Sequence, residues 1–210
     1  MDKEKLLQEG FIEVTDISLS DIIKVLPGQF KIEETYLKPN KEPRTNVRTL
    51  STEFGMNPLP FHTDGAHRLI PPRWTILQYG SKTESKSGTL LFDSKPASAD
   101  PHYEDLFFNE IYIVTGGVKP FLTSIINKQL SSLPIFRWNK LLMRKLLDKT
   151  KVTIDYLAIK PHHKVTWSPR KTLILDNWRI LHSREEVPKE EENTRIMTRY
   201  NLTPVEHASI

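Results

Sequence analysis

The stretch LILDNWRILHSR, residues 173–184, is the part of the sequence from which the fold can be read. An apolar run rich in strand-forming residues leads to the turn-forming pair Asp176-Asn177, and a second strand follows that carries His182. Aspartate and asparagine side chains bond readily to nearby backbone, so we expect this pair to build the turn that aims His182. The role of this histidine then depends on what the rest of the chain brings to it.

Strand patterns surround this stretch on both sides. We expect a short helix at 2–10, closed by Gly10, and strands at 11–17, 73–80, 88–96, 152–161, 162–168 and 194–204. The interval from about 100 to 150 is expected to be the most helical, with helices at 103–114 and 121–130 and in the basic run 137–151. The strands do not alternate with helices, which disfavours a doubly wound parallel sheet. The prediction is a mainly β core with flanking helices, whose two halves close on one another.

Composition limits the kind of protein. The 210 residues, 38% hydrophobic and 27% charged, fit one domain spanning 1–210. No segment approaches the roughly 20 apolar residues of a membrane span, and the charged N-terminus lacks a signal sequence, so a cytoplasmic protein is expected. The chain has no cysteine, so any metal must be held by nitrogen and oxygen ligands.

A second stretch, LPFHTDGAH at 59–67, offers two such ligands. His62 and Asp64 are two residues apart, so on an extended segment both side chains point to the same face. A pattern of this kind also arises by chance in a chain with seven histidines. His62 and Asp64 therefore need a third ligand, and His182 is the candidate. Two histidines and one carboxylate on one face of a metal leave open positions, as in non-haem Fe(II) oxygenases.

Four blocks, PLPFHTDGAH, SGTLLFD, LDNWRILHSR and TRIMTRY, carry a family resemblance in their order along residues 57–201. They resemble the signature blocks of Fe(II)/2-oxoglutarate-dependent dioxygenases, in the branch of taurine dioxygenase and clavaminate synthase. The resemblance implies a double-stranded β-helix, the jelly-roll core that cupins share. It also implies Fe(II) as cofactor, with 2-oxoglutarate and O2 as cosubstrates.

The same resemblance implies roles for individual residues. His62, Asp64 and His182 would be the catalytic iron ligands. Arg195, thirteen residues beyond His182, would grip the far carboxylate of 2-oxoglutarate with the help of the Thr89 hydroxyl. With Asp64 present, hydroxylation or a related oxidation is expected, because halogenases of the family replace this carboxylate with a small residue.

The substrate is less determined by the sequence. Arg199 shares a strand face with position 195, and His67 and Arg73 are further candidates for substrate contact. Arginines near the predicted mouth, Arg68 among them, favour an anionic group on a small amino-acid-like or natural-product metabolite. Two segments, about 36–57 and 97–130, are expected to act as lids.

Two alternatives stay open at this point. The pI near 9.1 is compatible with a nucleic-acid demethylase of the same superfamily, although the basic residues are not interleaved with aromatics in one stretch. A non-oxidative, cupin-like metal-binding protein would keep the metal ligands and use no 2-oxoglutarate, which leaves Arg195 without a role.

Overall fold

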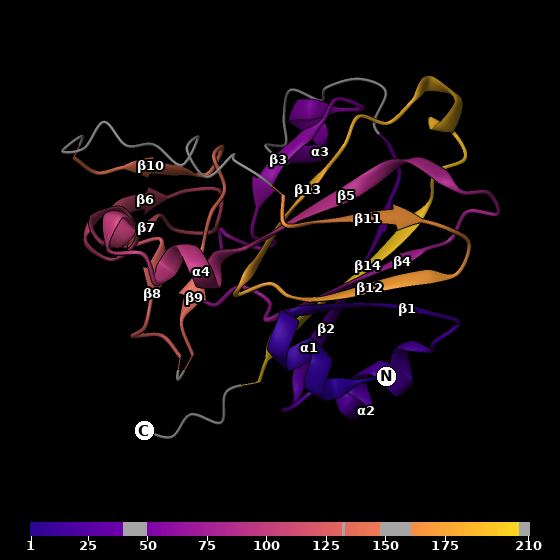
Figure 1. The fold of residues 1–210 in the computed structure, drawn as a ribbon. Coiled ribbons are helices and arrows are strands. Elements are labelled where there is room, and N and C mark those ends of the chain that lie inside the picture. The colour runs from indigo at the N-terminus through magenta and orange to yellow at the C-terminus, as the bar shows by residue number, and fades with distance from the viewer. Residues whose placement is uncertain (40–49, 132, 148–160, 206–210) are drawn as a thin grey trace.

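The structure is a computed structural model that describes residues 1–39, 50–131, 133–147 and 161–205. Its core consists of two antiparallel sheets that lie face to face (Figure 1). One sheet has the order β1 (Phe11–Thr15), β12 (Lys171–Asp176), β4 (Trp74–Tyr79), β14 (Met197–Pro204), β2 (Phe30–Leu37). The other has the order β11 (His163–Trp167), β5 (Ser85–Asp93), β13 (Ile180–Arg184), β3 (Leu59–His62). This confirms the predicted mainly β fold with a double-stranded β-helix core.

Alternation along the strands explains how the two sheets pack. In β4, Leu77 and Tyr79 point between the sheets, whereas Trp74 and Ile76 point to the outer face. The space between the sheets is filled by one apolar cluster with members from both, namely Leu77, Tyr79, Leu91, Val165, Trp167, Leu173, Leu175, Ile180 and Met197. Period-two patterns in the sequence therefore fix which face of each strand is buried.

Two N-terminal helices cover the outer face of the five-stranded sheet. Helix α1 (Lys3–Glu9) begins after Asp2, whose carboxylate accepts a hydrogen bond from the Lys5 N–H, and ends at Gly10 in the left-handed conformation. Together with α2 (Leu19–Val25) it packs Leu6 and Ile22 against the outward-pointing residues of the sheet. None of the described helices is long and apolar enough to cross a membrane.

An insertion between β5 and β11 covers the outer face of the four-stranded sheet. It contains α4 (Ser94–Ser98), the short helical turns η1 (Pro101–Tyr103) and η2 (Asp105–Asn109), and the strands β6 (Tyr112–Val114), β7 (Phe121–Thr123), β8 (Ile126–Asn127), β9 (Ile135–Phe136) and β10 (Met143–Lys145). Strands β10, β6 and β7 form a small sheet, and β8 pairs with β9. A second apolar cluster joins this insertion to Phe92 of β5 and Leu181 of β13.

The expectation of helices across 100–150 is wrong for most of this interval. The segments 112–114, 121–123 and 126–127 are strands, which suits their content of β-branched and aromatic residues. In the basic run, the Asn139 side chain accepts a hydrogen bond from the Leu141 N–H, forming a local turn in place of a helix. The predicted helix is thus absent from 137–147, and residues 148–151 lie outside the described part of the chain.

The other predicted elements agree with the structure within a few residues at their ends. The helix at 2–10 and the strands at 11–17, 73–80, 88–96, 162–168, 173–184 and 194–204 are confirmed. The strand predicted at 152–161 falls, except for its last residue, outside the described residues. The segment expected to act as a lid, 36–57, contains α3 (Leu50–Phe54), and residues 40–49 within it are not described.

Candidate metal centre and its cavity

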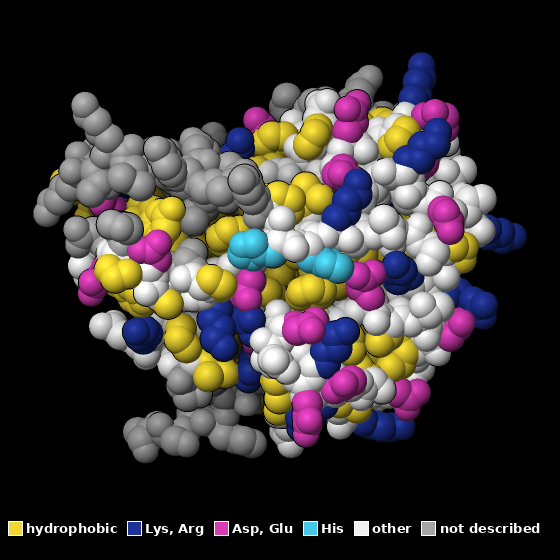
Figure 2. All heavy atoms as spheres, in the orientation of Figure 1, with side chains coloured by type: hydrophobic (Ala, Val, Ile, Leu, Met, Phe, Trp, Pro, Cys, Tyr) yellow, Lys and Arg dark blue, Asp and Glu magenta, His cyan; other side chains and the backbone are white. Residues whose placement is uncertain are grey.

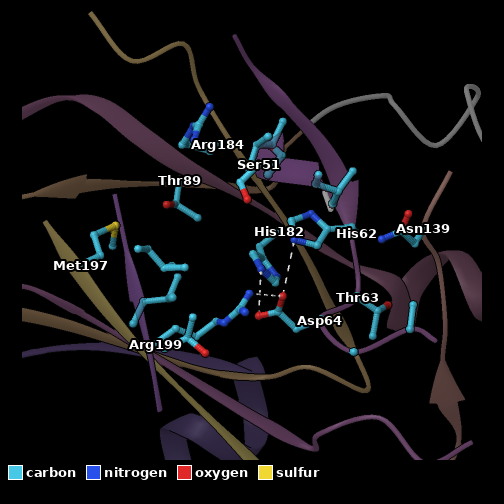
Figure 3. A pocket seen from close by; sticks show the side chains of 18 of the residues that line it. Ser51, His62, Thr63, Asp64, Thr89, Asn139, His182, Arg184, Met197 and Arg199 are labelled. Atoms are coloured by element: carbon cyan, nitrogen blue, oxygen red, sulfur yellow. Dashed lines mark hydrogen bonds and ion pairs between the residues drawn. The ribbon is translucent and has the colours of Figure 1, made fainter. Parts of the chain in front are cut away.

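Two neighbouring strands bring the predicted ligands together. His62 is the last residue of β3 and pairs in register with His182 of β13, and Asp64 follows in the turn after β3. Their side chains lie at one end of the space between the sheets, and each residue is less than one-tenth exposed. Figure 3 shows the two imidazoles and the carboxylate converging on one point. Sequence positions 120 residues apart thus form one cluster because β3 and β13 are adjacent.

The cluster has the dimensions of a site for a single metal ion. One ligand atom from each of His62, Asp64 and His182 lies within 4.8 Å of the others. The Nε2 atoms of His62 and His182 are each 3.7 Å from a different oxygen of Asp64. The imidazole centroids are 4.4 Å apart. Two imidazole nitrogens and one carboxylate are the donor set that suits non-haem iron.

The protonation states also fit a metal. The Nδ1 atom of His62 is 2.9 Å from the carbonyl oxygen of Pro60, which can only accept, so Nδ1 carries a proton and Nε2 is the nitrogen that faces the cluster. Burial, followed by the neighbouring His62, lowers the pKa of His182 to about 3, so this imidazole is neutral at pH 7. Burial would raise the pKa of Asp64, but the Arg199 guanidinium and the two imidazoles hold it well below its ordinary value. The cluster therefore offers two imidazole nitrogens, of which that of His182 belongs to a neutral ring, and one carboxylate.

The backbone at Asp64 is fixed from the opposite side by Asn177. The Asn177 side-chain oxygen accepts a hydrogen bond from the Asp64 N–H at 2.8 Å, and its amide nitrogen donates to the carbonyl oxygens of Asp64 at 3.0 Å and Pro72 at 2.8 Å. Gly65 follows with φ +65°, where a Cβ atom would lie 2.6 Å from Pro72 Cδ. Asn177 was expected to act within its own turn; the structure shows that it joins two distant turns.

Arg199 contacts the carboxylate of the cluster directly. Its Nη1 donates to Asp64 Oδ1 at 2.7 Å, while Asp64 Oδ2 is 3.5 Å from the Thr75 hydroxyl. The hydrogen bond from Arg199 orients the Asp64 carboxylate and stabilises its negative charge. Arg199 also lines the adjacent cavity, so the sequence expectation of a position near the site agrees with its placement.

The cluster opens into a cavity of about 520 Å³. Its walls are built from β2 and α3 on one side and from the segment 139–142 on another. Besides the cluster, the lining includes Thr35, Tyr36, Leu37, Lys38, Pro39, Leu50, Ser51, His67, Thr89, Asn139, Leu141, Leu142, Arg184, Arg195, Met197 and Arg199. Of the segment 36–57, residues 36–39, 50 and 51 line the cavity. No described residue of 97–130 lines it, and from the insertion the lining includes Asn139, Leu141 and Leu142. That 36–57 and 97–130 act as lids stays a prediction.

Arg195 is a buried cation in this cavity. It is 5% exposed, and its guanidinium makes no hydrogen bond or ion pair with any described residue. Burial lowers its pKa, against the opposing effect of Tyr79 and Glu191. The Glu191 carboxylate is itself occupied, because it accepts hydrogen bonds from the Ser85 hydroxyl and the Lys86 N–H. A buried guanidinium with free donors is a strong site for an anion.

Of the remaining residues predicted to contact the substrate, one lines the cavity and two lie outside its lining. His67 lines the cavity, and burial with Arg68 and Arg137 lowers its pKa. Arg68 pairs with Glu33 outside the lining. Arg73 does not reach the cavity: it lies over the Trp74 and Trp178 rings, with its Nε 3.8 Å from Asp176. Its burial against two aromatic rings gives it a packing position in place of the predicted substrate contact.

Sequence reasoning missed Arg137, which fixes the loop behind the cluster. It is fully buried, and its guanidinium donates to the carbonyl oxygens of Ala66, Arg68 and Leu69. In the sequence it belongs to a basic run with helical spacing, and nothing local distinguishes it from a surface arginine. Its function depends on the loop at 66–69, which only the folded chain brings to it.

The fold of this chain is similar to that of several solved structures. A scan against protein-family models and a search of curated proteins both find no match. Among solved structures, the chain is similar to asparagine oxygenase (TM-score 0.64, 14% identity, covering 96% of this chain and 75% of that one). It is similar to AAD-2, solved with Mn(II) and N-oxalylglycine (TM-score 0.63, 14% identity, 97% and 88%). PvcB, an Fe, alpha-ketoglutarate-dependent oxygenase from an isonitrile synthetic pathway, is also similar (TM-score 0.59, 12% identity, 95% and 77%). The chain thus has the fold of these oxygenases.

Proposed function

We propose that this chain is an Fe(II)- and 2-oxoglutarate-dependent oxygenase. It would hydroxylate, desaturate or cyclise at an unactivated C–H bond of a small amino-acid-like or natural-product metabolite. One observation carries the proposal: the His62–Asp64–His182 cluster lines the same cavity as the buried guanidinium of Arg195, which has no hydrogen-bond partner among the described residues. A metal site and an anion site in one cavity match a cosubstrate that carries a metal-chelating group at one end and a carboxylate at the other.

Different residues of the cavity would hold the iron and the cosubstrate. His62, Asp64 and His182 would hold Fe(II), and this two-histidine, one-carboxylate donor set suits a metal that must also accept a chelating cosubstrate and O2. Arg195 would bind the 5-carboxylate, with Thr89 as a second donor, and Arg199 holds the carboxylate of Asp64 in place. The iron supplies the redox chemistry, and hydroxylation converts 2-oxoglutarate, O2 and R–H into succinate, CO2 and R–OH.

The charges in the cavity support a substrate with an anionic group. Lys38, Arg184, Arg195 and Arg199 line it, whereas Asp64 is the one described acidic residue of the lining. Two similar structures were solved with relevant small molecules: asparagine oxygenase with hydroxyasparagine and succinate, and AAD-2 with N-oxalylglycine. An amino acid, which carries a carboxylate, fits both the charge and the dimensions of the cavity.

The two alternatives are less well supported. A cupin-like protein that uses the metal alone gives no reason for burying Arg195 where the described part of the chain offers its guanidinium no hydrogen-bond partner. A nucleic-acid demethylase needs aromatic side chains at the mouth on which an extruded base can stack. The described lining contains one such residue, Tyr36, which is 72% exposed.

The test is anaerobic spectroscopy of Fe(II)-loaded protein during titration with 2-oxoglutarate. Wild type is expected to develop a weak visible charge-transfer band, because the cosubstrate chelates the iron. Asp64→Ala should lose or displace the band, and Arg195→Ala should need on the order of ten- to a hundredfold more 2-oxoglutarate. Arg170→Ala, at an exposed arginine paired with Asp16, is the control and should behave as wild type.

Two results would contradict the proposal. An iron-loaded wild type that gives no band at saturating 2-oxoglutarate would favour the metal-only alternative. An Arg195→Ala variant that saturates at the wild-type concentration would remove Arg195 from the cosubstrate site.

A further inference from the structure

Trp167 makes an internal hydrogen bond to a residue of the cavity wall. It lies on β11, is 1% exposed, and its indole Nε1–H donates to the Thr89 hydroxyl oxygen at 3.0 Å. The indole is held by the apolar cluster between the sheets, with the Tyr79 ring centroid 5.9 Å away. Trp167 itself does not line the cavity. Any influence it has on a ligand must therefore pass through Thr89.

This hydrogen bond limits what the Thr89 hydroxyl can do. A hydroxyl has one proton to donate and two lone pairs that accept, and the indole N–H occupies one lone pair. Thr89 is 4% exposed, and its hydroxyl donates to none of the described residues. Because Thr89 lines the cavity, its proton is left to a ligand there. Figure 3 shows Thr89 near Arg184 and Met197, on the side of the histidines away from Asn139.

Two arginines share this part of the cavity wall: Arg184 of β13 pairs in register with Thr89 of β5, and burial, followed by the neighbouring Arg195, lowers the pKa of Arg184. The guanidinium of Arg195 has donors only and no described acceptor. Arg184 is already bonded to the backbone, since it donates to the carbonyl oxygens of Gly55 and Asn57. A ligand group placed between Thr89 and Arg195 therefore meets hydrogen-bond donors. An ionised carboxylate can accept hydrogen bonds from all of these groups. The NH2 group of an amide only donates, so it would find no acceptor there.

We propose that Trp167 is a positioning residue that fixes the Thr89 hydroxyl as a donor and so makes this end of the cavity selective for a carboxylate over its amide. The inference rests on the proposed function, because it takes the 5-carboxylate of 2-oxoglutarate as the group bound there. Without the indole N–H, the hydroxyl is free to rotate and to turn a lone pair toward the ligand. Removing the N–H then weakens carboxylate binding and weakens the discrimination against the amide.

The experiment measures binding of 2-oxoglutarate and of its 5-amide, 2-oxoglutaramate, to Mn(II)-loaded protein by calorimetry. Trp167→Phe removes the N–H and keeps an aromatic ring. The expected result is a roughly three- to tenfold increase in the Kd of 2-oxoglutarate with a smaller change for the amide, and an unchanged Kd for Mn(II). Trp74→Phe is the matched control, because Trp74 is fully buried and its indole N–H has no partner among the described residues.

A double-mutant cycle separates positioning from packing. Thr89→Val removes the hydroxyl at nearly constant volume, and in this background Trp167→Phe should add no further loss of 2-oxoglutarate affinity. If Trp167→Phe folds poorly, benzothienylalanine at position 167 keeps the indole shape without the N–H, and it should give the same increase in Kd.

Three outcomes would overturn the inference. The first is an unchanged Kd for 2-oxoglutarate in both position-167 variants. The second is an equal loss in the Thr89→Val background, which would mean that Trp167 acts through packing. The third is a Mn(II)-loaded wild type that binds no 2-oxoglutarate, and this outcome alone also removes the proposed function.

Discussion

Asp176 combines a turn position with an unusual degree of burial for a carboxylate. Its Oδ1 accepts a hydrogen bond from the Trp178 N–H at 3.1 Å, and Oδ2 lies 3.8 Å from Arg73 Nε. Burial raises its pKa to about 6, although Arg73, the Trp178 N–H and Arg179 oppose this shift. The turn role expected from the sequence is confirmed. The shifted pKa could not be expected, because it depends on the elements that pack over the turn.

The raised pKa of Asp176 predicts a pH dependence of stability. A folded-state pKa of about 6, above the ordinary value of 3.8, gives a stabilisation that is complete below pH 3.8 and lost as the pH rises through 6. Between pH 4 and 7 the free energy of unfolding of wild type should therefore fall by about 2–3 kcal/mol relative to Asp176→Asn. The asparagine oxygen can still accept from the Trp178 N–H. Urea denaturation across this pH range measures the difference.

Asp16→Asn controls for the removal of a carboxylate, because Asp16 lies in an exposed turn beside Arg170. If wild type and Asp176→Asn showed parallel pH profiles, the carboxyl would not titrate with a raised pKa.

At the scale of elements, the site depends on contacts between turns. The β12–β13 turn supplies Asn177, which bonds to the backbone of Asp64 after β3 and to Pro72 before β4. The segment after β9 supplies Arg137, which bonds to the carbonyl oxygens at 66–69. The turn that follows β3, which has its own backbone hydrogen bond from the Arg68 N–H to the Gly65 carbonyl oxygen, is thus also held by side chains from two other parts of the chain.

Asn177→Ala is predicted to affect both stability and metal binding. It leaves the Asp64 N–H and the carbonyl groups of Asp64 and Pro72 without their partner, which should cost about 3 kcal/mol of unfolding free energy. Since the ligand Asp64 is then no longer held, affinity for Mn(II) should fall about tenfold or more. Urea denaturation and metal titration measure the two effects.

Asn127→Ala is the matched control for this prediction. The Asn127 side-chain oxygen accepts from the N–H groups of Gln129 and Leu130 within the insertion, so its loss should reduce stability without changing metal affinity. Equal metal affinity in Asn177→Ala and wild type would show that Asp64 keeps its position without Asn177.

At the scale of the whole molecule, three apolar clusters share the two sheets. One lies between the sheets, one under α1 and α2, and one under the insertion. Phe92 and Leu181 of the four-stranded sheet belong to the insertion cluster, while their neighbours Leu91 and Ile180 face the other sheet. In the space-filling view, hydrophobic side chains also reach the surface over the insertion (Figure 2). Because Phe92 and Leu181 belong to the same apolar cluster as the buried residues of the insertion, the insertion and the four-stranded sheet share one continuous core.

This attachment predicts that the insertion and the sheets unfold together. Phe107 is fully buried in the insertion cluster, so Phe107→Ala should lower the free energy of unfolding by about 3–5 kcal/mol. The transition should remain single, with far-UV circular dichroism and tryptophan fluorescence giving the same midpoint and an unchanged denaturant slope. Two separate transitions in this variant would show that the insertion unfolds on its own.

The sequence by itself predicted the β core, and it pointed to His62, Asp64 and His182 as candidate ligands, which the structure places together. Strand alternation is a local property, so β1, β4, β5, β12, β13 and β14 could be predicted from short segments. The sequence blocks around His62 and His182 contain the three candidate ligands. In the insertion the same reasoning was wrong, because mixed apolar and polar segments satisfy helix and strand patterns alike and packing on the four-stranded sheet decided between them.

Tertiary structure alone decided which polar groups are buried and what they contact. Arg195 and Arg73 are both arginines beside strands. Arg195 lines the cavity and finds no hydrogen-bond partner in the described part of the chain, whereas Arg73 packs over the rings of Trp74 and Trp178. Asn177 reaches Asp64, and Trp167 reaches Thr89, across 113 and 78 residues. A residue's own sequence neighbourhood sets its backbone conformation. Its charge state and hydrogen bonds depend on distant segments, which only the packed sheets bring within reach.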